Sequence, residues 1–207
     1  MNIVENRRNS RNLKQVRAFN TKEKIIDTAY KLFCQKGYYK TTSIEISKTA
    51  GVSIGCFYSY FKDKDAVFFE ILNLYSKDFL EIINEISDML DLYKKDKEEW
   101  LLFLMNKLIE IHEKSRDLNK ELSALYNSNS TVASVIDEQR NKVKQFIKDF
   151  LTKYKDDINV TDLDAAAIIM YDVINSIVDR IVFEKKEISS DRILKAGIEA
   201  INKYLYK

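Results

Sequence analysis

The sequence predicts an all-α protein, on the basis of its composition and its hydrophobic periodicity. The 207 residues include no proline and only four glycines, the residue types that most often interrupt helices and mark turns. Hydrophobic residues make up 45% of the chain, and they recur at the helical spacing that gives each helix a buried face. We therefore expect about nine helices, arranged as a small N-terminal three-helix domain and a larger helical domain.

Residues 1–20 are expected to form a flexible arm before the first helix. The segment shows little apolar periodicity, and its basic residues are Arg7, Arg8, Arg11, Lys14 and Arg17. The first helix is predicted from Thr21, whose side chain can cap it, to Gly37, because glycine commonly ends a helix. The small domain is expected to occupy residues 21–66.

A short second helix is predicted to start at Thr42. Thr42 and Glu45 have the spacing of a capping box, in which the threonine side chain and the glutamate side chain each accept a backbone N–H. Ile44 and Ile46 are its core candidates, and it is expected to stop near Ala50.

A turn, Ala50-Gly51-Val52-Ser53, joins this helix to another short one that runs to Phe61. Gly51 permits the backbone turn, Val52 is an apolar plug between the helices, and Ser53 can cap the second helix. Two short helices joined in this way predict a helix-turn-helix. The aromatic side chains expected to pack in the core nearby are Tyr38, Phe57 and Phe61.

The larger domain is expected to span residues 67–207. It begins within a long helix that Asp63 caps and that carries an apolar stripe to Leu90. More helices follow on both sides of a polar loop at residues 127–131, and the last helix ends near Leu205.

The segment 165–182 stands out because it is apolar around most of a helix. Thr161 and Asp164 repeat the cap spacing just before it. A helix of this kind must be covered on more than one side. It is either a central core helix, or one that packs on its own chain with one face and on a second copy with another.

Charge is distributed unevenly along the chain. Residues 1–64 carry 13 Lys+Arg and 5 Asp+Glu, a net of +8, and the other residues carry 21 and 27, a net of −6. The asymmetry suggests that only the N-terminal part meets a polyanion. An uneven scatter of surface charge is the alternative explanation.

Several functional classes find little support in the sequence. No apolar run is long enough for a membrane span, and no signal peptide is recognisable, so we expect a cytoplasmic protein without a membrane partner. Cys34 and Cys56 make neither a disulfide framework nor a zinc site, and His112 is the single histidine. We expect no metal, no cofactor and no enzymatic activity, since no phosphate-binding loop or nucleophile elbow is present.

Residues 21–67 resemble the DNA-binding domain of the TetR/AcrR family of transcriptional regulators. The matching residues are Ile25-Ile26, Ala29, Phe33, Gly37-Tyr38, Thr41-Thr42, Ile46, Ala50-Gly51-Val52-Ser53, Gly55, Tyr58, Tyr60-Phe61 and Lys64. Ser47 and Cys56 depart from the alanine and threonine that are frequent in the family, and a thiol is a poor hydrogen-bond donor. The resemblance implies a homodimeric regulator of transcription that binds operator DNA.

The resemblance also implies which residues touch DNA. They are Thr42, Ser43, Ser53, Ile54, Gly55, Cys56, Tyr58, Tyr60 and Lys64. Hydroxyl groups and the lysine suit phosphate oxygens, whereas Ile54, Gly55 and Cys56 lie where base edges or thymine methyls would be met. Partial burial of Tyr58 in the core is the alternative. The basic arm is a further candidate for DNA contact, with a solubilising tail as its alternative.

Family members typically hold a small-molecule effector in the larger domain, and its binding commonly releases a repressor from its operator. The side chains suited to an apolar pocket here are Phe79, Trp100, Phe103, Met105, His112, Tyr126, Phe146, Phe150, Met170 and Tyr171. Plain core packing is the alternative for each of them. The dimer is expected to form through the last two helices, at Ile174, Ile177, Val178, Ile181, Ile198, Ile201 and Leu205.

Two other functions use the same fold. One is a structural or division-control protein that binds DNA without a small-molecule effector, and the other is a sensor that responds to a protein partner. Wide genomic occupancy would favour the first, and a few operators near the protein's own gene would favour the regulator. The sequence leaves open the effector, the operator, the regulated genes and the choice between repression and activation.

Overall fold

The computed structural model describes the backbone of residues 3–184 and 187–206. Side chains are described from residue 19 onward, apart from those at positions 78–80, 83, 87–88 and 90–91. The chain divides into two compact units, Met1–Tyr75 and Ser76–Lys207. This boundary lies inside a helix and later than the boundary expected after residue 66.

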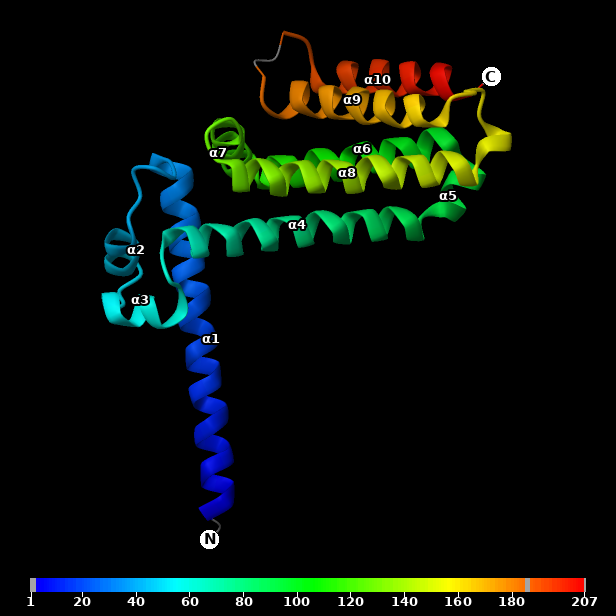
Figure 1. The fold of residues 1–207 in the computed structure, drawn as a ribbon. Helices are drawn as coiled ribbons and strands as arrows, with labels where there is room; N and C mark the ends of the chain where they lie inside the picture. Colours follow the sequence, from blue (N-terminus) through cyan, green and yellow to red (C-terminus); the bar gives the residue numbers. More distant parts are fainter. Residues whose placement is uncertain (1–2, 185–186, 207) are drawn as a thin grey trace. The chain divides into compact units, whose positions relative to one another are not determined.

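The N-terminal unit is built from four helices (Figure 1). They are α1 (Ile3–Lys36), α2 (Ser43–Thr49), α3 (Ile54–Tyr60) and the first part of α4 (Lys64–Asp88). Each contributes to one apolar core, in which the fully buried side chains are Ile25, Ala29, Phe33, Ile46, Phe57, Val67 and Phe68. Phe33 and Phe68 meet edge to face, with their ring centroids 5.2 Å apart, so α1 and α4 pack directly on each other.

The C-terminal unit holds the end of α4 and all later helices. They are α5 (Leu90–Lys95), α6 (Lys97–Lys114), α7 (Arg116–Tyr126), α8 (Ser130–Lys153), the 3-10 helix η1 (Lys155–Asp157), α9 (Leu163–Val182) and α10 (Ser190–Leu205). The all-α fold and the helix-turn-helix are therefore confirmed. The described residues form ten α-helices, against about nine expected. No helix of this described part has the length and apolarity needed to cross a membrane.

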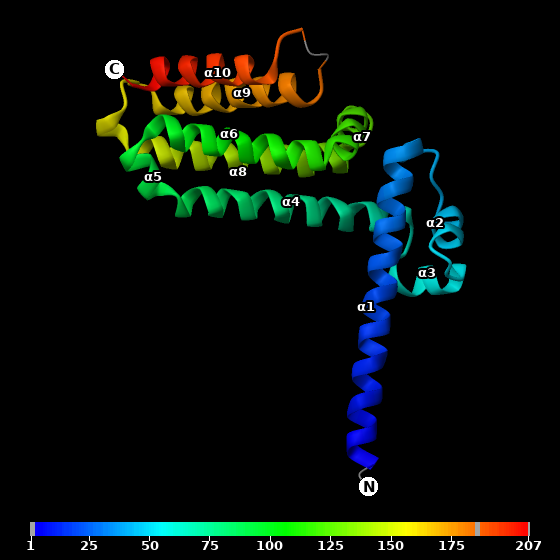
Figure 2. The same cartoon turned by 180° about the vertical axis from the view of Figure 1, so that it is seen from behind.

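Helix α9 lies at the centre of the C-terminal unit, where it packs on α6, α8 and α10. Figures 1 and 2 show α9 and α10 side by side from opposite directions. Ala166, Ala167 and Met170 at the start of α9 and Ile181 near its end are buried. Segment 165–182 thus packs on its own chain, as both alternatives require, and a contact of another face with a second copy stays a prediction. Ile168 and Ile169 remain 48% and 47% exposed, so the same helix also keeps an apolar outer face.

The first helix differs most from expectation. In place of a flexible arm followed by a cap at Thr21, one helix runs from Ile3 to Lys36. No proline or glycine occurs in this range, and the arginines and lysines of residues 7–17 are good helix formers, so nothing stops the helix from extending toward the N-terminus. Gly37 ends it as expected, with a positive φ of 86°.

Other helix caps and boundaries also differ from those that the sequence predicts. The side chain that caps α9 is Asp162, which accepts the Ala165 amide at 3.0 Å, and not Thr161. Asp63 does cap α4, through a 2.8 Å bond from the Ala66 amide. The polar loop is shorter than expected, because Asn129 already caps α8. Asp162 and Asn129 are among the strongest helix-capping residue types, which explains both shifts.

We predict that Gly51→Ala destabilises the protein, whereas Gly55→Ala does not. Gly51 has a φ of 63°, a conformation that costs an alanine about 1 kcal/mol, and an added Cβ would meet only the Lys24 ammonium, at 3.6 Å. Gly55 is helical, and no atom lies within 4 Å of an added Cβ. Chemical denaturation of both variants measures the difference. Equal midpoints for the two variants would contradict the prediction.

Candidate nucleic-acid interface

The helix-turn-helix is held together by local caps that the sequence encodes. The Thr42 hydroxyl accepts the Glu45 amide at 3.2 Å, and the Ser53 hydroxyl accepts the Cys56 amide at 3.1 Å. Between the two helices the Val52 amide donates to the Ser47 carbonyl at 3.0 Å, while Gly51 takes the positive φ. Both predicted N-caps are confirmed, and each hydroxyl that accepts a cap bond keeps its own hydrogen for donation.

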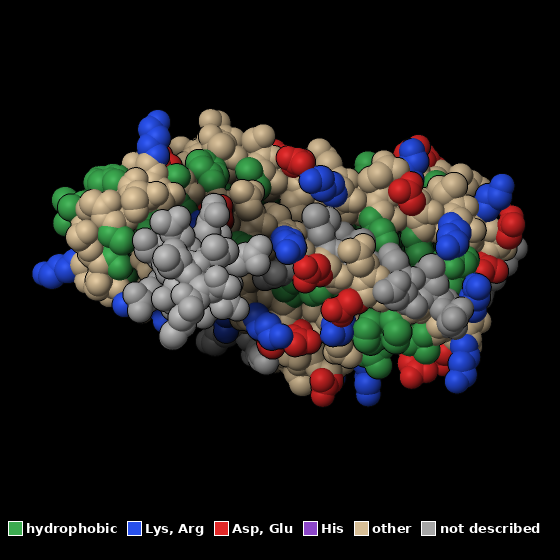
Figure 3. Space-filling model, turned by 90° about the horizontal axis from the view of Figure 1, so that it is seen from below, with side chains coloured by type: hydrophobic (Ala, Val, Ile, Leu, Met, Phe, Trp, Pro, Cys, Tyr) green, Lys and Arg blue, Asp and Glu red, His purple; other side chains and the backbone are tan. Residues whose placement is uncertain are grey.

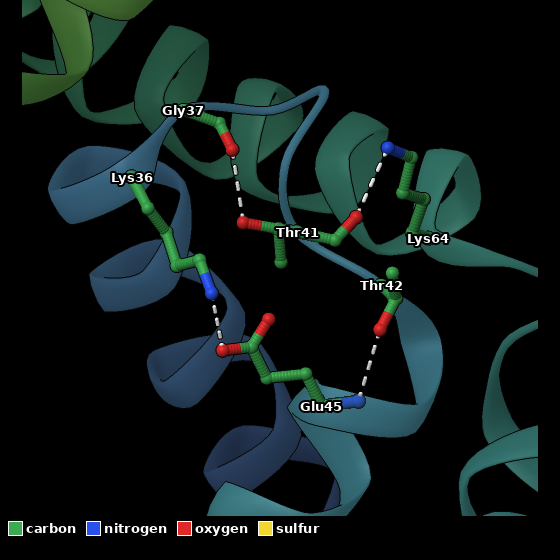
Figure 4. Close-up of polar contacts among 6 residues, drawn as sticks. All are labelled: Lys36, Gly37, Thr41, Thr42, Glu45 and Lys64. Atoms are coloured by element: carbon green, nitrogen blue, oxygen red, sulfur yellow. Dashed lines mark hydrogen bonds and ion pairs between the residues drawn. The ribbon is translucent and has the colours of Figure 1, made fainter.

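The capping box at Thr42 is only half formed. The carboxylate of Glu45 pairs with the Lys36 ammonium at 2.5 Å, and so links α2 to the last turn of α1 (Figure 4). The Thr41 hydroxyl donates to the Gly37 carbonyl at 2.9 Å in the same loop. An ion pair to a neighbouring helix therefore engages the glutamate that sequence spacing assigned to the cap.

Lys64 ties the start of α4 to the loop between α1 and α2. Its ammonium donates to the Tyr38 carbonyl at 2.8 Å and to the Thr41 carbonyl at 3.0 Å, and it lies 4.3 Å from the centre of the Tyr38 ring (Figure 4). The family resemblance implies a phosphate contact for this lysine. Its present partners give it a structural role, and a phosphate contact would have to use its remaining N–H.

Tyr38 completes this junction from the core side. Its side chain is buried, as predicted, and its hydroxyl donates to the Asp65 carboxylate at 2.6 Å. Burial and the adjacent Asp65 carboxylate both raise the pKa of Tyr38, so the phenol stays protonated. The loop, α1 and α4 are thereby joined by buried aromatic packing and by hydrogen bonds.

Helix α3 presents one buried and one exposed face. Phe57 and Phe61 are buried, which confirms their core assignment. Ile54 is 40% exposed and Tyr58 54% exposed, one turn apart on the outer face, so core packing is not the role of Tyr58. Gly55 is also exposed, and it leaves open space where a side chain would stand.

The structure brings the predicted DNA-contacting residues to one helix-turn-helix but exposes them unequally. The exposed ones are Thr42, Ser53, Ile54, Gly55 and Tyr58, and the half-buried ones are Ser43, Cys56, Tyr60 and Lys64. Their contacts with DNA stay a prediction.

One surface residue was assigned wrongly. Ile44 is 69% exposed, although it was expected in the core with Ile46, which is fully buried. Residues two apart on a helix point in nearly opposite directions, so only one of the two could face the core. Helical periodicity alone therefore indicates that Ile44 and Ile46 are not both buried. Tyr39, which the sequence analysis does not single out, is 63% exposed because its neighbour Tyr38 occupies the core.

The side chains predicted to line an effector pocket separate into two groups. The first group is aromatic: Trp100 and Phe150 stack at 4.9 Å with nearly parallel rings, and Tyr93 and Tyr154 pack around them. The indole N–H of Trp100 and the hydroxyl of Tyr154 are buried, and neither has a hydrogen-bond partner among the described residues. Tyr93 was not predicted, although it is completely buried.

The second group is polar and joins α6, α7, α8 and α9. The Tyr126 hydroxyl donates to Asp137 at 2.8 Å, and the Arg140 guanidinium lies 4.8 Å from the Tyr126 ring. Burial lowers the pKa of His112, and partial desolvation raises the pKa of Asp179, which the nearby His112 opposes. Two titratable groups whose pKa values shift in opposite directions therefore influence each other electrostatically in this cluster.

The remaining pocket candidates have ordinary packing roles or are not described. Phe146 packs against the core, as do the buried Met105 and Met170, and Phe103 lies under the Lys107 ammonium at 5.8 Å. The Tyr171 ring lies 4.9 Å from the Lys144 ammonium. The side chain of Phe79 is outside the described residues.

Most of the residues predicted for a dimer interface are buried within the single chain. They are Val178, Ile181, Ile198, Ile201 and Leu205, each no more than 6% exposed. Only Ile174 and Ile177 are partly exposed. The prediction is wrong for the buried five, because the apolar face of each helix first covers the core of its own chain.

Two family models match the chain. The model described as bacterial regulatory proteins, tetR family, matches residues 25–71, and the model described as tetracyclin repressor-like, C-terminal domain, matches residues 77–206. The first covers the helix-turn-helix and the second covers most of the C-terminal unit.

Relatives match the chain over stretches of different length. The uncharacterized HTH-type transcriptional regulator YuxN of Bacillus subtilis is 51% identical over 65 residues, which are 30% of this chain and 22% of that protein. QacR of Staphylococcus aureus is 46% identical over 55 residues, 27% of this chain and 29% of that protein. YvkB of Bacillus subtilis is 29% identical over 131 residues, 63% and 66% of the two chains. The chain thus spans less than a third of the length of the first two.

Solved structures match over nearly the whole chain at low identity. The fatty acid degradation regulator FadR of Bacillus halodurans has a TM-score of 0.67 and 20% identity, and covers 87% of this chain and 94% of its own. A transcriptional regulator of Saccharomonospora viridis in complex with choline has a TM-score of 0.70 and 15% identity, with coverages of 91% and 98%. These likenesses support the fold of both units.

We predict that Lys64→Met lowers the free energy of unfolding by about 1 kcal/mol, because it removes two charge-assisted hydrogen bonds of a half-buried ammonium while keeping its apolar stem. Lys62→Met is the matched control, since Lys62 is exposed and only two positions away. Thermal melting of both variants measures the effect. A Lys64→Met protein with the same melting temperature as the wild type would refute the structural role of Lys64.

Proposed function

The chain belongs to the tetR family of bacterial regulatory proteins, and on that premise we propose that it is a homodimeric repressor of transcription, which binds operator DNA and which a small, largely apolar effector releases. Its place in a family of transcriptional regulators follows from the match over both units. The repressor role, the effector and the interface are the proposal.

The observation that carries the DNA-binding proposal is the outer face of α3. Ile54, Gly55 and Tyr58 are exposed on a helix whose opposite face, at Phe57, is completely buried. The Ser53 cap and the buried Phe57 hold this helix in place, which suits a helix that must enter the major groove as a rigid body. The net charge of +8 over residues 1–64 suits a polyanionic partner.

The arm is proposed to add affinity without sequence specificity. The backbone of residues 3–20 continues α1 as a helix, and the sequence there carries Arg7, Arg8, Arg11, Lys14 and Arg17. A cationic segment next to a DNA-reading unit gains free energy by releasing counterions from phosphates.

Dimerisation is proposed through the outer faces of α9 and α10. Ile168 and Ile169 on α9 are about half exposed, and Tyr204 on α10 is 41% exposed. Ala196 and Ala200 lie exposed on α10 at helical spacing from Tyr204. Exposed apolar and small side chains on two adjacent helices suit a self-complementary contact about a two-fold axis.

The aromatic group around Trp100 supports the effector proposal. A buried indole N–H and a buried phenol without partners are costly in a core, and a ligand with hydrogen-bond acceptors would satisfy them. Stacked rings beside these groups suit an apolar or aromatic body. The structural neighbour that was solved in complex with choline is a precedent for small-molecule binding in a protein of this fold.

Release would work by linkage between the two sites. An effector that prefers the form with low DNA affinity reduces operator binding by its differential affinity for the two forms. Helix α4 is the natural lever, because it starts in the N-terminal unit at Lys64 and continues into the C-terminal unit beyond Tyr75.

We predict that the purified protein protects a two-fold symmetric site in DNA upstream of its own gene, and that deleting residues 1–18 keeps this footprint but flattens the salt dependence of binding. Each phosphate contact that is lost should reduce the slope of log affinity against log salt by about 0.9. Footprinting with competitor DNA and titration at several salt concentrations are the measurements. Binding that competitor removes entirely would refute a specific operator at this site, and an unchanged slope would refute the role of the arm.

We predict that an effector changes the fluorescence of Trp100, the single tryptophan, and lowers operator affinity over the same concentration range. Trp100→Phe retains an aromatic ring beside Phe150 but loses the indole donor, so half-release should require about 5 times more effector. The measurements are fluorescence titration and operator release with choline, medium-chain fatty acids and small aromatic compounds. Leu102→Ala, at an exposed position of α6, is the control. Equal release of wild type and Trp100→Phe would refute the assignment.

A further inference from the structure

The exposed surface of the helix-turn-helix is unusually apolar for a surface that meets a polyanion. Ile44 on α2 is 69% exposed, and Ile54 on α3 is 40% exposed. Exposed isoleucines cost free energy in water unless a partner covers them. Figure 3 shows hydrophobic side chains at the surface over α2 and α3, with lysine or arginine side chains at the margin.

Helix α3 lacks the side chains that usually read bases through hydrogen bonds. Residues 53–61 contain no Arg, Lys, Asn, Gln, Asp or Glu, and the specific pairings with guanine, adenine and cytosine use those residue types. The Ser59 hydroxyl donates to the Cys56 carbonyl at 2.7 Å, so its hydrogen is engaged within the helix. The Cys56 thiol is a weak donor. Apolar contact is the main means of readout that this face retains.

Positive charges lie around the apolar surface. Lys40, Lys48 and Lys62 are exposed, and they come from the loop before α2, from the end of α2 and from the segment after α3. The acidic residue of this stretch, Glu45, is already paired with Lys36. An apolar face with cationic margins suits a groove whose edges are phosphates and whose floor carries methyl groups.

We propose that Ile44 and Ile54, on either side of the turn, recognise the C5 methyl groups of thymines in an A·T-rich half-site. This inference rests on the proposed operator binding and names the chemistry by which the operator is read. Gly55 leaves room for the base edges to approach α3, and the surrounding lysines hold the phosphates. Ile44 thereby acts as a specificity-determining residue on α2, the helix that is not expected to carry the base readout.

The thymine methyl is the one apolar group in the major groove, so an isoleucine placed against it discriminates thymine from the other bases. Covering a methyl group changes affinity by about fourfold. A half-site read through several such contacts would therefore reach useful specificity without a bidentate hydrogen bond. The other occupant of such a face would be an apolar surface of a protein partner, in which case the isoleucines would not affect DNA affinity.

The experiment selects duplexes from a randomised pool with the full-length wild-type protein. The enriched half-sites are then resynthesised with deoxyuridine, which lacks the C5 methyl, at each thymine in turn. We expect thymine-rich half-sites, and a loss of about fourfold in affinity for each contacted methyl. Ile44→Ala and Ile54→Ala should each weaken binding to the thymine duplex by a similar factor and should no longer distinguish uracil from thymine at one position.

Leu74→Ala is the matched control, because Leu74 is a 42% exposed apolar residue of α4 outside the helix-turn-helix. It should bind both duplexes as the wild type does, and melting curves should show that Ile44→Ala remains folded. Enrichment followed by equal affinity for thymine and uracil would overturn the methyl readout while leaving operator binding intact. If the wild-type protein enriches a sequence but the isoleucine variants bind it with normal affinity, the methyl readout is overturned in favour of a protein partner. Failure to enrich any sequence would overturn the proposed function and this inference together.

Discussion

The N-terminal unit depends on one constraint: the two helices of its helix-turn-helix are too short to be stable alone. Helices α2 and α3 have seven residues each, whereas isolated helices are marginal below about 12 residues. They must be held by tertiary contacts, and the structure supplies these through the buried side chains of α1 and α4 and through the Lys64 ammonium, which binds two carbonyls of the loop before α2. The position of α3 is therefore a property of the whole unit.

The same constraint leaves one face of the short helices for function. Ile46 and Phe57 direct their side chains into the core, so Ile44, Ile54 and Tyr58 are left outside. Residues that hold the unit together and residues that remain exposed alternate along the same two helices. A substitution on the inner face would therefore disturb the stability of the unit, whereas one on the outer face would leave its core intact.

The C-terminal unit follows a different logic, because its central helix is long and apolar. Helix α9 is covered by α6, α8 and α10, and this burial fixes which side chains remain available. On the outer face these are Ile168 and Ile169. Inside, the aromatic group at Trp100 and the polar group at His112 and Asp179 hold buried or partly buried polar atoms that a pure packing core would avoid.

The sequence by itself determined the helical class, the helix-turn-helix and the caps at Thr42, Ser53 and Asp63, because each depends on residues within one turn of each other. It also placed Phe57, Phe61 and Tyr38 in the core. Only the tertiary structure decided that Glu45 pairs with Lys36, that Lys64 binds the loop, that Ile44 is exposed and that Val178, Ile181, Ile198, Ile201 and Leu205 are buried in their own chain. Those outcomes depend on which helix lies opposite each side chain. Local periodicity gives the apolar face of a helix, but it does not say what covers that face.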